Sequence, residues 1–205
     1  MFSKLATNLD NDSWAKTLPP IHAQEPFMAA PQLVPPVKLI VAALWSRSTI
    51  LEHALDLMTE RWGAIDFRGA EHPFDVTDYY APEMGPNLRR QLFAFAKLVP
   101  PEWLKELKLA CNQIEDQLRN DRGREVNLDI GYLDHNKIVL ASCKYAGQKI
   151  PLGDGIHADL IARYAKGKYQ PFEWTFPDFK TDRYDGELNA IRARYLEQLR
   201  ELKHT

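Results

Sequence analysis

The stretch that decides the fold is Lys38–Trp45, which spells KLIVAALW. After its lysine this stretch is wholly apolar, and it lies between Pro36 and Ser46. A short, continuous apolar run with such boundaries is typical of a strand whose two faces are both covered. We therefore predict a buried strand here, and we expect the ordered part of the chain to begin with it.

A helix is predicted directly after this strand. Thr49 and Glu52 have the spacing of a capping box, in which side chains satisfy backbone amides of the first turn. Gly63 suits the left-handed conformation that ends many helices. The residues between them form an apolar stripe at helical spacing, namely Leu51, Ala54, Leu55, Met58 and Trp62.

From this helix onward, predicted strands and helices alternate. The apolar pattern indicates short strands at 65–67 and 74–76, a strand at 88–99, a helix at 101–118 and a strand at 126–132. The whole order is strand, helix, strand, strand, helix, strand. It is the order of ferredoxin-like domains, which have an antiparallel sheet with helices on one face.

The remaining segments extend this core. Alternating apolar residues predict strands at 138–144, 156–164 and 172–176, and apolar residues at helical spacing predict a last helix at 185–202. The predicted fold class is therefore α+β. It consists of a ferredoxin-like βαββαβ core, further antiparallel strands and a C-terminal helix.

Residues 1–36 differ from the rest of the chain. They contain six of its fourteen prolines. Proline removes a backbone donor and restricts the preceding residue to extended conformations. We expect a proline-rich, flexible tail at 1–36 and a single α+β domain at 37–205, because 205 residues allow one domain with a sizeable core.

Composition narrows the class of protein. The chain has 26 basic and 28 acidic residues, so it lacks the excess of positive charge that nucleic-acid binding favours. No stretch approaches the roughly 20 apolar residues that cross a bilayer, so we expect no membrane partner. The two cysteines, Cys111 and Cys143, have no metal-binding spacing and favour a reducing, cytoplasmic compartment.

The familiar catalytic motifs are absent from the sequence. It has no GxxxxGK[ST] phosphate loop, no GxGxxG, no GxSxG and no HExxH. The sequence therefore assigns no reaction and no catalytic residue, and leaves open whether the protein is an enzyme.

Polar residues recur on the predicted strands and in one loop. Asn127 and Asp129 lie on the opposite face of their strand from its apolar residues, and His157 and Asp159 share a face of another strand. An antiparallel sheet would bring these residues and Lys144 onto one polar face. A lysine beside acids in a cleft is suited to hold a phosphate or a carboxylate. We predict that this face binds a small molecule, phosphorylated or nucleotide-like.

The predicted ligand-binding residues also include loop positions, because a loop with paired tyrosines, an acid and a proline-marked turn is typical of function. Asp129, His157 and Asp159 are further candidates for binding a divalent cation, the one cofactor these residues indicate. The full candidate set is Tyr80, Glu83, Asn127, Asp129, Lys144, His157, Asp159 and Asp178.

Two structural alternatives remain open at this stage. The polar strand face is also what a solvated sheet surface looks like, and Glu83 is placed to pair with Arg89 or Arg90. The alternative function is a non-enzymatic protein-interaction module or homo-oligomer, in which the tail and exposed aromatic residues contact a partner.

A series of short stretches lies along the chain in a fixed order: Thr77-Asp78-Tyr79-Tyr80, Glu83-Met84-Gly85, Asn127-Leu128-Asp129, Gly131-Tyr132-Leu133, Leu140-Ala141-Ser142 with Lys144, Gly155-Ile156, Trp174-Thr175 and Pro177-Asp178. In this order they resemble a bacterial family known as domain of unknown function 4416, over about residues 36–202. The resemblance implies a bacterial, cytoplasmic protein and supplies no reaction. At Gln148-Lys149-Ile150 the chain departs from an His-Arg-Ile run of the family, and His157 and Asp159 replace Tyr and Glu.

Overall fold

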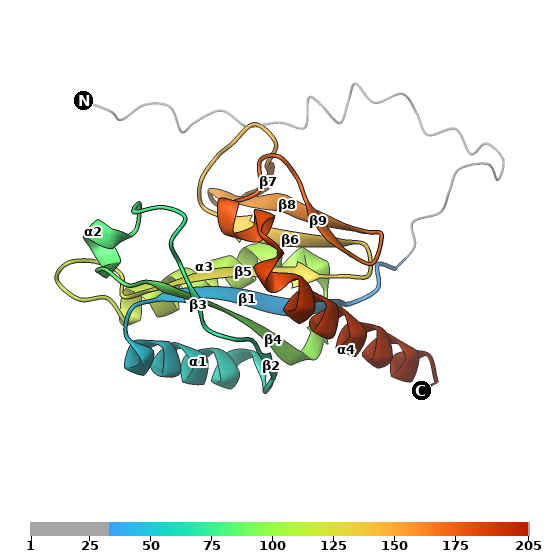
Figure 1. The fold of residues 1–205 in the computed structure, drawn as a ribbon. Coiled ribbons are helices and arrows are strands. Elements are labelled where there is room, and N and C mark those ends of the chain that lie inside the picture. The colour runs from blue at the N-terminus through green and yellow to red at the C-terminus, as the bar shows by residue number, and fades with distance from the viewer. Residues whose placement is uncertain (1–32, 205) are drawn as a thin grey trace, which may run out of the picture. The chain divides into compact units, whose positions relative to one another are not determined.

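The computed structural model describes residues 33–204 of the chain (Figure 1). Of the predicted proline-rich tail, residues 1–32 lie outside this described part. The strands of the described residues form one nine-stranded sheet. Seven of them follow the order β2-β4-β1-β5-β6-β8-β7, while β3 pairs with β4 and β9 pairs with β8. All of these pairings are antiparallel.

The elements have the following bounds along the chain. The strands are β1 (Val37–Trp45), β2 (Ile65–Arg68), β3 (His72–Pro73), β4 (Arg89–Val99), β5 (Val126–Leu133), β6 (Lys137–Ser142), β7 (Ile150–Gly153), β8 (Ile156–Ala165) and β9 (Lys168–Pro171). The α-helices are α1 (Ser48–Trp62), α2 (Ala81–Met84), α3 (Leu104–Gln117) and α4 (Asp185–His204), and short 3-10 helices span Pro101–Trp103, Pro177–Lys180 and Asp182–Tyr184.

Strand β1 lies inside the sheet, between β4 and β5, and every residue of it is buried. Its side chains alternate between two cores, as a pleated strand requires. Leu39 and Val41 belong to the core beneath α1 and α3, whereas Ile40 and Ala42 belong to a second core beneath α4. Helices α1 and α3 therefore pack on one face of β1 and α4 on the other. The predicted buried strand is confirmed.

The predicted α+β class is confirmed by this mixture of helices and antiparallel strands. None of the helices in the described range is both long enough and apolar enough to cross a membrane.

The predicted strand at 172–176 is wrong. The strand ends earlier, at Pro171, and the aromatic residues that follow lie in a turn in which Phe172 stacks on Trp174 with ring centroids 4.8 Å apart. Thr175 closes this turn, because its Oγ1 accepts a hydrogen bond from the Phe172 amide at 3.1 Å. The alternating aromatic residues therefore belong to a turn with stacked rings and not to a β-strand.

Two smaller predictions also need correction. Helix α1 begins at Ser48 with Arg47 at its N-cap and without a side-chain cap, so Thr49 and Glu52 form no capping box. The predicted strand at 74–76 is replaced by the two-residue strand His72–Pro73. Phe74 instead packs in a separate small core with Leu44, Tyr80, Met84 and Leu88.

Buried tyrosines predict loss of stability in alkali. Burial raises the pKa of Tyr195 to about 12, and it also raises the pKa values of Tyr169 and Tyr184. An unfolded tyrosine ionises near pH 10, so the unfolded chain loses protons that the folded chain keeps. The free energy of unfolding should therefore fall as the pH rises from about 10 to about 12, by up to ~1.4 kcal/mol per tyrosine per pH unit.

Urea unfolding at several pH values between 9 and 11.5 would measure this loss. Tyr195→Phe should lose less stability over that range than the parent, whereas Tyr145→Phe, at a 78% exposed position, should match the parent. Equal losses in all three proteins would contradict the prediction.

Candidate functional site

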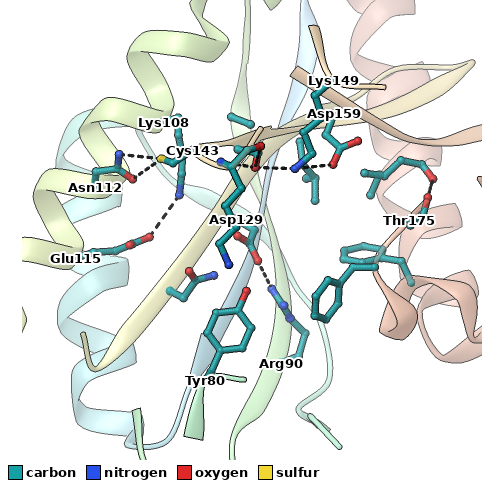
Figure 2. Close-up of a pocket in the computed structure, with 18 of the residues that line it drawn as sticks. Tyr80, Arg90, Lys108, Asn112, Glu115, Asp129, Cys143, Lys149, Asp159 and Thr175 are labelled. Atoms are coloured by element: carbon teal, nitrogen blue, oxygen red, sulfur yellow. Dashed lines mark hydrogen bonds and ion pairs between the residues drawn. The ribbon is translucent and has the colours of Figure 1, made fainter. Parts of the chain in front are cut away.

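The candidate site lies where strands β5 and β6 stop pairing. Their ladder has only three pairs, which join Gly131 to Leu140, Tyr132 to Val139 and Leu133 to Ile138. Beyond this ladder, residues of both strands line a cavity of about 200 Å³ (Figure 2). Because the sheet is open there, side chains of α3 reach the cavity from one face and side chains of β4 and β8 complete it.

Gly131 allows the two strands to approach closely at the last pair of the ladder. A Cβ atom at this position would lie 2.2 Å from the Val139 carbonyl oxygen and 2.9 Å from the Leu140 Cα. Both contacts are with backbone, which cannot rotate away. A glycine is therefore required at the inner end of the cavity.

Eight of the nineteen residues that line the cavity are charged. Five lining residues are basic and three are acidic. The basic residues are Arg90, Lys108, Arg124, Lys144 and Lys149, and the acidic residues are Glu115, Asp129 and Asp159.

Arg90 on β4 is the most buried of these charges, at 2% exposed. Its Nη1 donates to Asp129 Oδ2 at 2.6 Å and to the Ala42 carbonyl at 2.9 Å, and its Nε lies 3.4 Å from Asp178 Oδ2. Burial alone would raise the pKa of Asp129, but the charges of Arg90 and Lys108 outweigh it and hold that pKa below its usual value. Asp129 is therefore a carboxylate at neutral pH.

Asp178 also faces Arg90, but from the side of the C-terminal segments. It is fully buried, and burial raises its pKa although Arg90 opposes the shift. The Tyr184 hydroxyl donates to Asp178 Oδ2 at 3.1 Å. Two carboxyl groups therefore share one buried arginine, with Asp129 on the cavity side.

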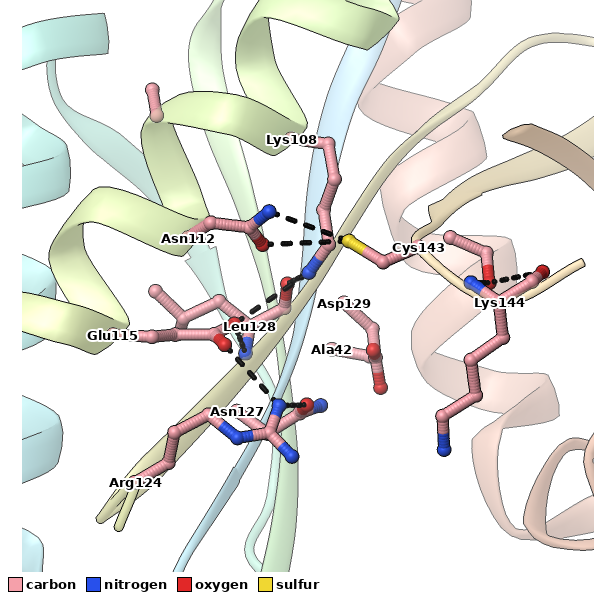
Figure 3. A network of polar contacts seen from close by, with 12 residues as sticks. Ala42, Lys108, Asn112, Glu115, Arg124, Asn127, Leu128, Asp129, Cys143 and Lys144 are labelled. Atoms are coloured by element: carbon pink, nitrogen blue, oxygen red, sulfur yellow. Dashed lines mark hydrogen bonds and ion pairs between the residues drawn. The ribbon is translucent and has the colours of Figure 1, made fainter. Parts of the chain in front are cut away.

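A second charge pair closes the α3 side of the cavity. Lys108 Nζ donates to the Leu128 carbonyl at 3.0 Å and lies 3.6 Å from Glu115 Oε1, and both side chains are buried (Figure 3). Burial disfavours the charge of Lys108, but Glu115 and Asp129 outweigh this effect and its pKa lies above the usual value. Glu115 Oε1 also accepts from the Leu128 amide at 2.7 Å. Helix α3 is thereby fixed to β5.

Arg124 connects the cavity to the loop that carries α2. It donates through Nε and Nη2 to the two oxygens of Glu83, at 2.9 and 2.8 Å, and through Nη1 to Asn127 Oδ1 at 2.8 Å. The same Nη1 donates to Glu115 Oε2 at 3.3 Å. Hydrogen bonds from Arg124 lower the pKa of Glu83. Glu83 therefore pairs with Arg124, and the predicted pairing of Glu83 with Arg89 or Arg90 is wrong.

The outer wall is formed by the segment after β6. Lys149 donates to Ser142 Oγ at 2.8 Å and pairs with Asp159 Oδ2 at 3.2 Å. Lys144 is different, because its ammonium lies 3.9 Å from the centroid of the Tyr79 ring and has no carboxylate partner within residues 33–204. Lys144 is the basic residue of the wall whose charge no acid offsets.

The structure brings most of the predicted residues together. Tyr80, Asn127, Asp129, Lys144 and Asp159 line the cavity. The other three predicted residues do not line it. Glu83 reaches the site only through Arg124, Asp178 only through Arg90, and His157 packs against Tyr145 with ring centroids 5.8 Å apart.

The candidate metal ligands do not form a metal site. Asp129 faces Arg90 and Asp159 faces Lys149, so each carboxylate already has a cation beside it. In the described range 33–204, no group of three or more His, Cys, Asp and Glu side chains is placed to hold a metal ion. The predicted divalent cation does not fit these residues.

Sequence reasoning missed Arg90, Lys108 and Glu115. One signal for the last two was present, since Lys108 and Glu115 lie within the apolar stripe of α3, beside Leu107, Cys111 and Ile114. A charged residue at such a position is buried on folding and needs a partner.

Fold and cavity together define an α+β protein with a charged pocket between two neighbouring strands, lined by five basic and three acidic residues. The chain belongs to the family described as domain of unknown function (DUF4416), whose model matches residues 35–195, as the resemblance predicted. Comparison with curated proteins and with solved structures found no match.

Proposed function

We propose that the cavity between β5 and β6 binds a small anionic molecule that carries a phosphate group. One observation carries the proposal. Each of the three acids of the wall already faces a basic residue, and Lys144 remains without an acid. A confined, partly desolvated space lined by an ammonium group without an acid partner favours an anion.

The donors around the cavity suit a phosphate. Ser142 ends β6, Lys144 and Lys149 come from the segment that follows, and Lys108 comes from α3; all four line the cavity. Ammonium groups donate through several rotatable hydrogens and bind phosphate oxygens as point charges. Charge-assisted hydrogen bonds of this kind contribute about 1.5–3 kcal/mol each.

The size of the cavity limits the ligand. At about 200 Å³ it is smaller than the roughly 300–1,000 Å³ of most small-molecule pockets. It therefore encloses a phosphate and the few atoms next to it, and any larger part of the ligand lies at the mouth. A divalent cation is not needed, because the wall itself supplies the positive charge.

A thermal-shift screen of the full chain against inorganic phosphate, sugar phosphates and nucleotides tests the proposal. A phosphorylated compound present at 100 times its dissociation constant should stabilise the fold by about 2.7 kcal/mol. Lys144→Ala should weaken that binding by about tenfold or more, whereas Lys97→Ala, an exposed lysine of β4 outside the cavity, should not. No shift with any phosphorylated compound would sink the proposal.

Glu83 gives a second, independent test. Its carboxylate occupies Arg124, a lining residue, so it competes with any anion that approaches this arginine. Glu83→Gln should therefore tighten binding of the phosphorylated compound about two- to fivefold, since removing one negative charge near the surface changes such interactions by up to about 1 kcal/mol. Glu52→Gln, which removes a carboxylate paired with the exposed Arg68, is the control. Isothermal titration would show the change, and weaker binding by Glu83→Gln would contradict the competition.

We further propose that β1, α1, β2, β4, α3 and β5 form a ferredoxin-like unit. The strand order β2-β4-β1-β5, antiparallel throughout, supports this proposal, as does the position of both helices over one core. An experimental structure with β1 at a sheet edge would contradict it.

A further inference from the structure

An exposed aromatic ring lies at the wall of the cavity. Phe176 is 38% exposed, although it is a large apolar side chain, and it lines the same space as the basic residues. Leaving apolar area in water is unfavourable. A bound ligand that covers the Phe176 ring would shield it from water, which is favourable.

The ring is held in place before any ligand arrives. Phe176 stacks on Phe74 with centroids 5.9 Å apart and planes 12° from parallel. Phe74 is itself buried and has the guanidinium of Arg90 5.0 Å from its centroid. Phe74 therefore lies between the Phe176 ring and the buried ion pair of Arg90 and Asp129.

The backbone around Phe176 is also fixed. The preceding Thr175 is buried and donates through its hydroxyl to the Ile161 carbonyl. The Phe179 amide donates to the Phe176 carbonyl at 3.1 Å, at the start of the 3-10 helix Pro177–Lys180. A ring that is already ordered loses little conformational entropy on binding, which makes it an effective contact surface.

We propose that the ligand carries a flat, unsaturated ring next to its phosphate, with the ring stacked on Phe176. The inference rests on the proposed function, because the phosphate must occupy the basic wall for the ring to reach Phe176. It adds a chemical class to that function, namely aromatic phosphate esters. Stacking beyond the burial of area is worth about 2- to 12-fold in affinity, from roughly 0.5–1.5 kcal/mol.

Titration calorimetry with three probes tests this inference on the full chain: inorganic phosphate, phenyl phosphate and cyclohexyl phosphate. The last two differ in the flatness of a ring of similar size. Phenyl phosphate should bind about 2- to 12-fold more tightly than cyclohexyl phosphate. Phe176→Leu should abolish this preference and leave inorganic phosphate unaffected. Tyr145→Leu, which removes an exposed ring outside the cavity, should preserve it.

Each other outcome is decisive. If inorganic phosphate binds and phenyl phosphate shows no advantage over cyclohexyl phosphate, the ring inference is overturned and the proposed function stands. If the advantage persists in Phe176→Leu, the ring binds elsewhere and the assignment to Phe176 is overturned. If none of the three probes binds, the proposed function fails and the inference fails with it.

Discussion

Replacing Arg90 with methionine should lower the free energy of unfolding by about 3–5 kcal/mol, the range seen when one partner of a buried ion pair is removed. Arg90 is 2% exposed and is the cation beside both Asp129 and Asp178. Methionine fills similar space with no charge, so two carboxyl groups lose their partner at once. The Ala42 carbonyl also loses a donor.

Urea denaturation of Arg90→Met and of Arg89→Met would measure this effect. Arg89 is the neighbouring residue, but its side chain is 42% exposed and lies 3.7 Å from Glu71, so its loss should cost less than about 1 kcal/mol. The deficit of Arg90→Met should also shrink as the pH is lowered, because protonation neutralises the stranded carboxylates. Equal costs for the two variants would mean that the charge pair does not support the fold.

Gly131→Ala should destabilise the protein by about 1–3 kcal/mol, the usual cost of forcing a methyl group into a packed site. The added Cβ would lie 2.2 Å from the Val139 carbonyl oxygen, so β5 and β6 must move apart where the cavity begins. Because the cavity wall is built from both strands, phosphate binding should weaken in the same variant.

The matched control is Gly147→Ala, in the segment between β6 and β7. A Cβ atom there would have no neighbour within 4 Å. This variant should be as stable as the parent or slightly more stable, since alanine restricts the unfolded chain. If chemical denaturation shows Gly131→Ala to be equally neutral, the close approach of the two strands is not what shapes the cavity.

Local pattern was enough to predict most elements of the fold. The apolar run at Lys38–Trp45 predicts β1, and the apolar stripes predict α1, α3 and α4. These predictions succeed because burial on one face or both leaves a direct periodic trace in a sequence. The prediction at 172–176 fails because stacked aromatic residues in a turn produce the same alternation as a strand.

The cavity depends on where β5 and β6 stop pairing, and the local sequence does not show that position. The ladder between β5 and β6 has three residue pairs, and no sequence pattern within either strand predicts the end of this ladder. Alternation along β5 still predicted Asn127 and Asp129 correctly as residues of one polar face. It could not show that Asp129 would face a buried arginine from β4, which makes it a counter-ion rather than a metal ligand. The interaction-module alternative depended largely on residues 1–36, most of which lie outside the described range.

The most direct test of the central claim is a titration of the isotope-labelled full chain with glycerol phosphate, followed through backbone amide resonances. We predict saturable shifts centred on residues 142–149 and 124–129, the two segments that contribute four of the eight charged residues of the wall. The same titration of Lys144→Ala should show them only at about tenfold higher concentration. Shifts confined to other surfaces, or none at millimolar phosphate ester, would contradict the account of this cavity as a phosphate-binding site.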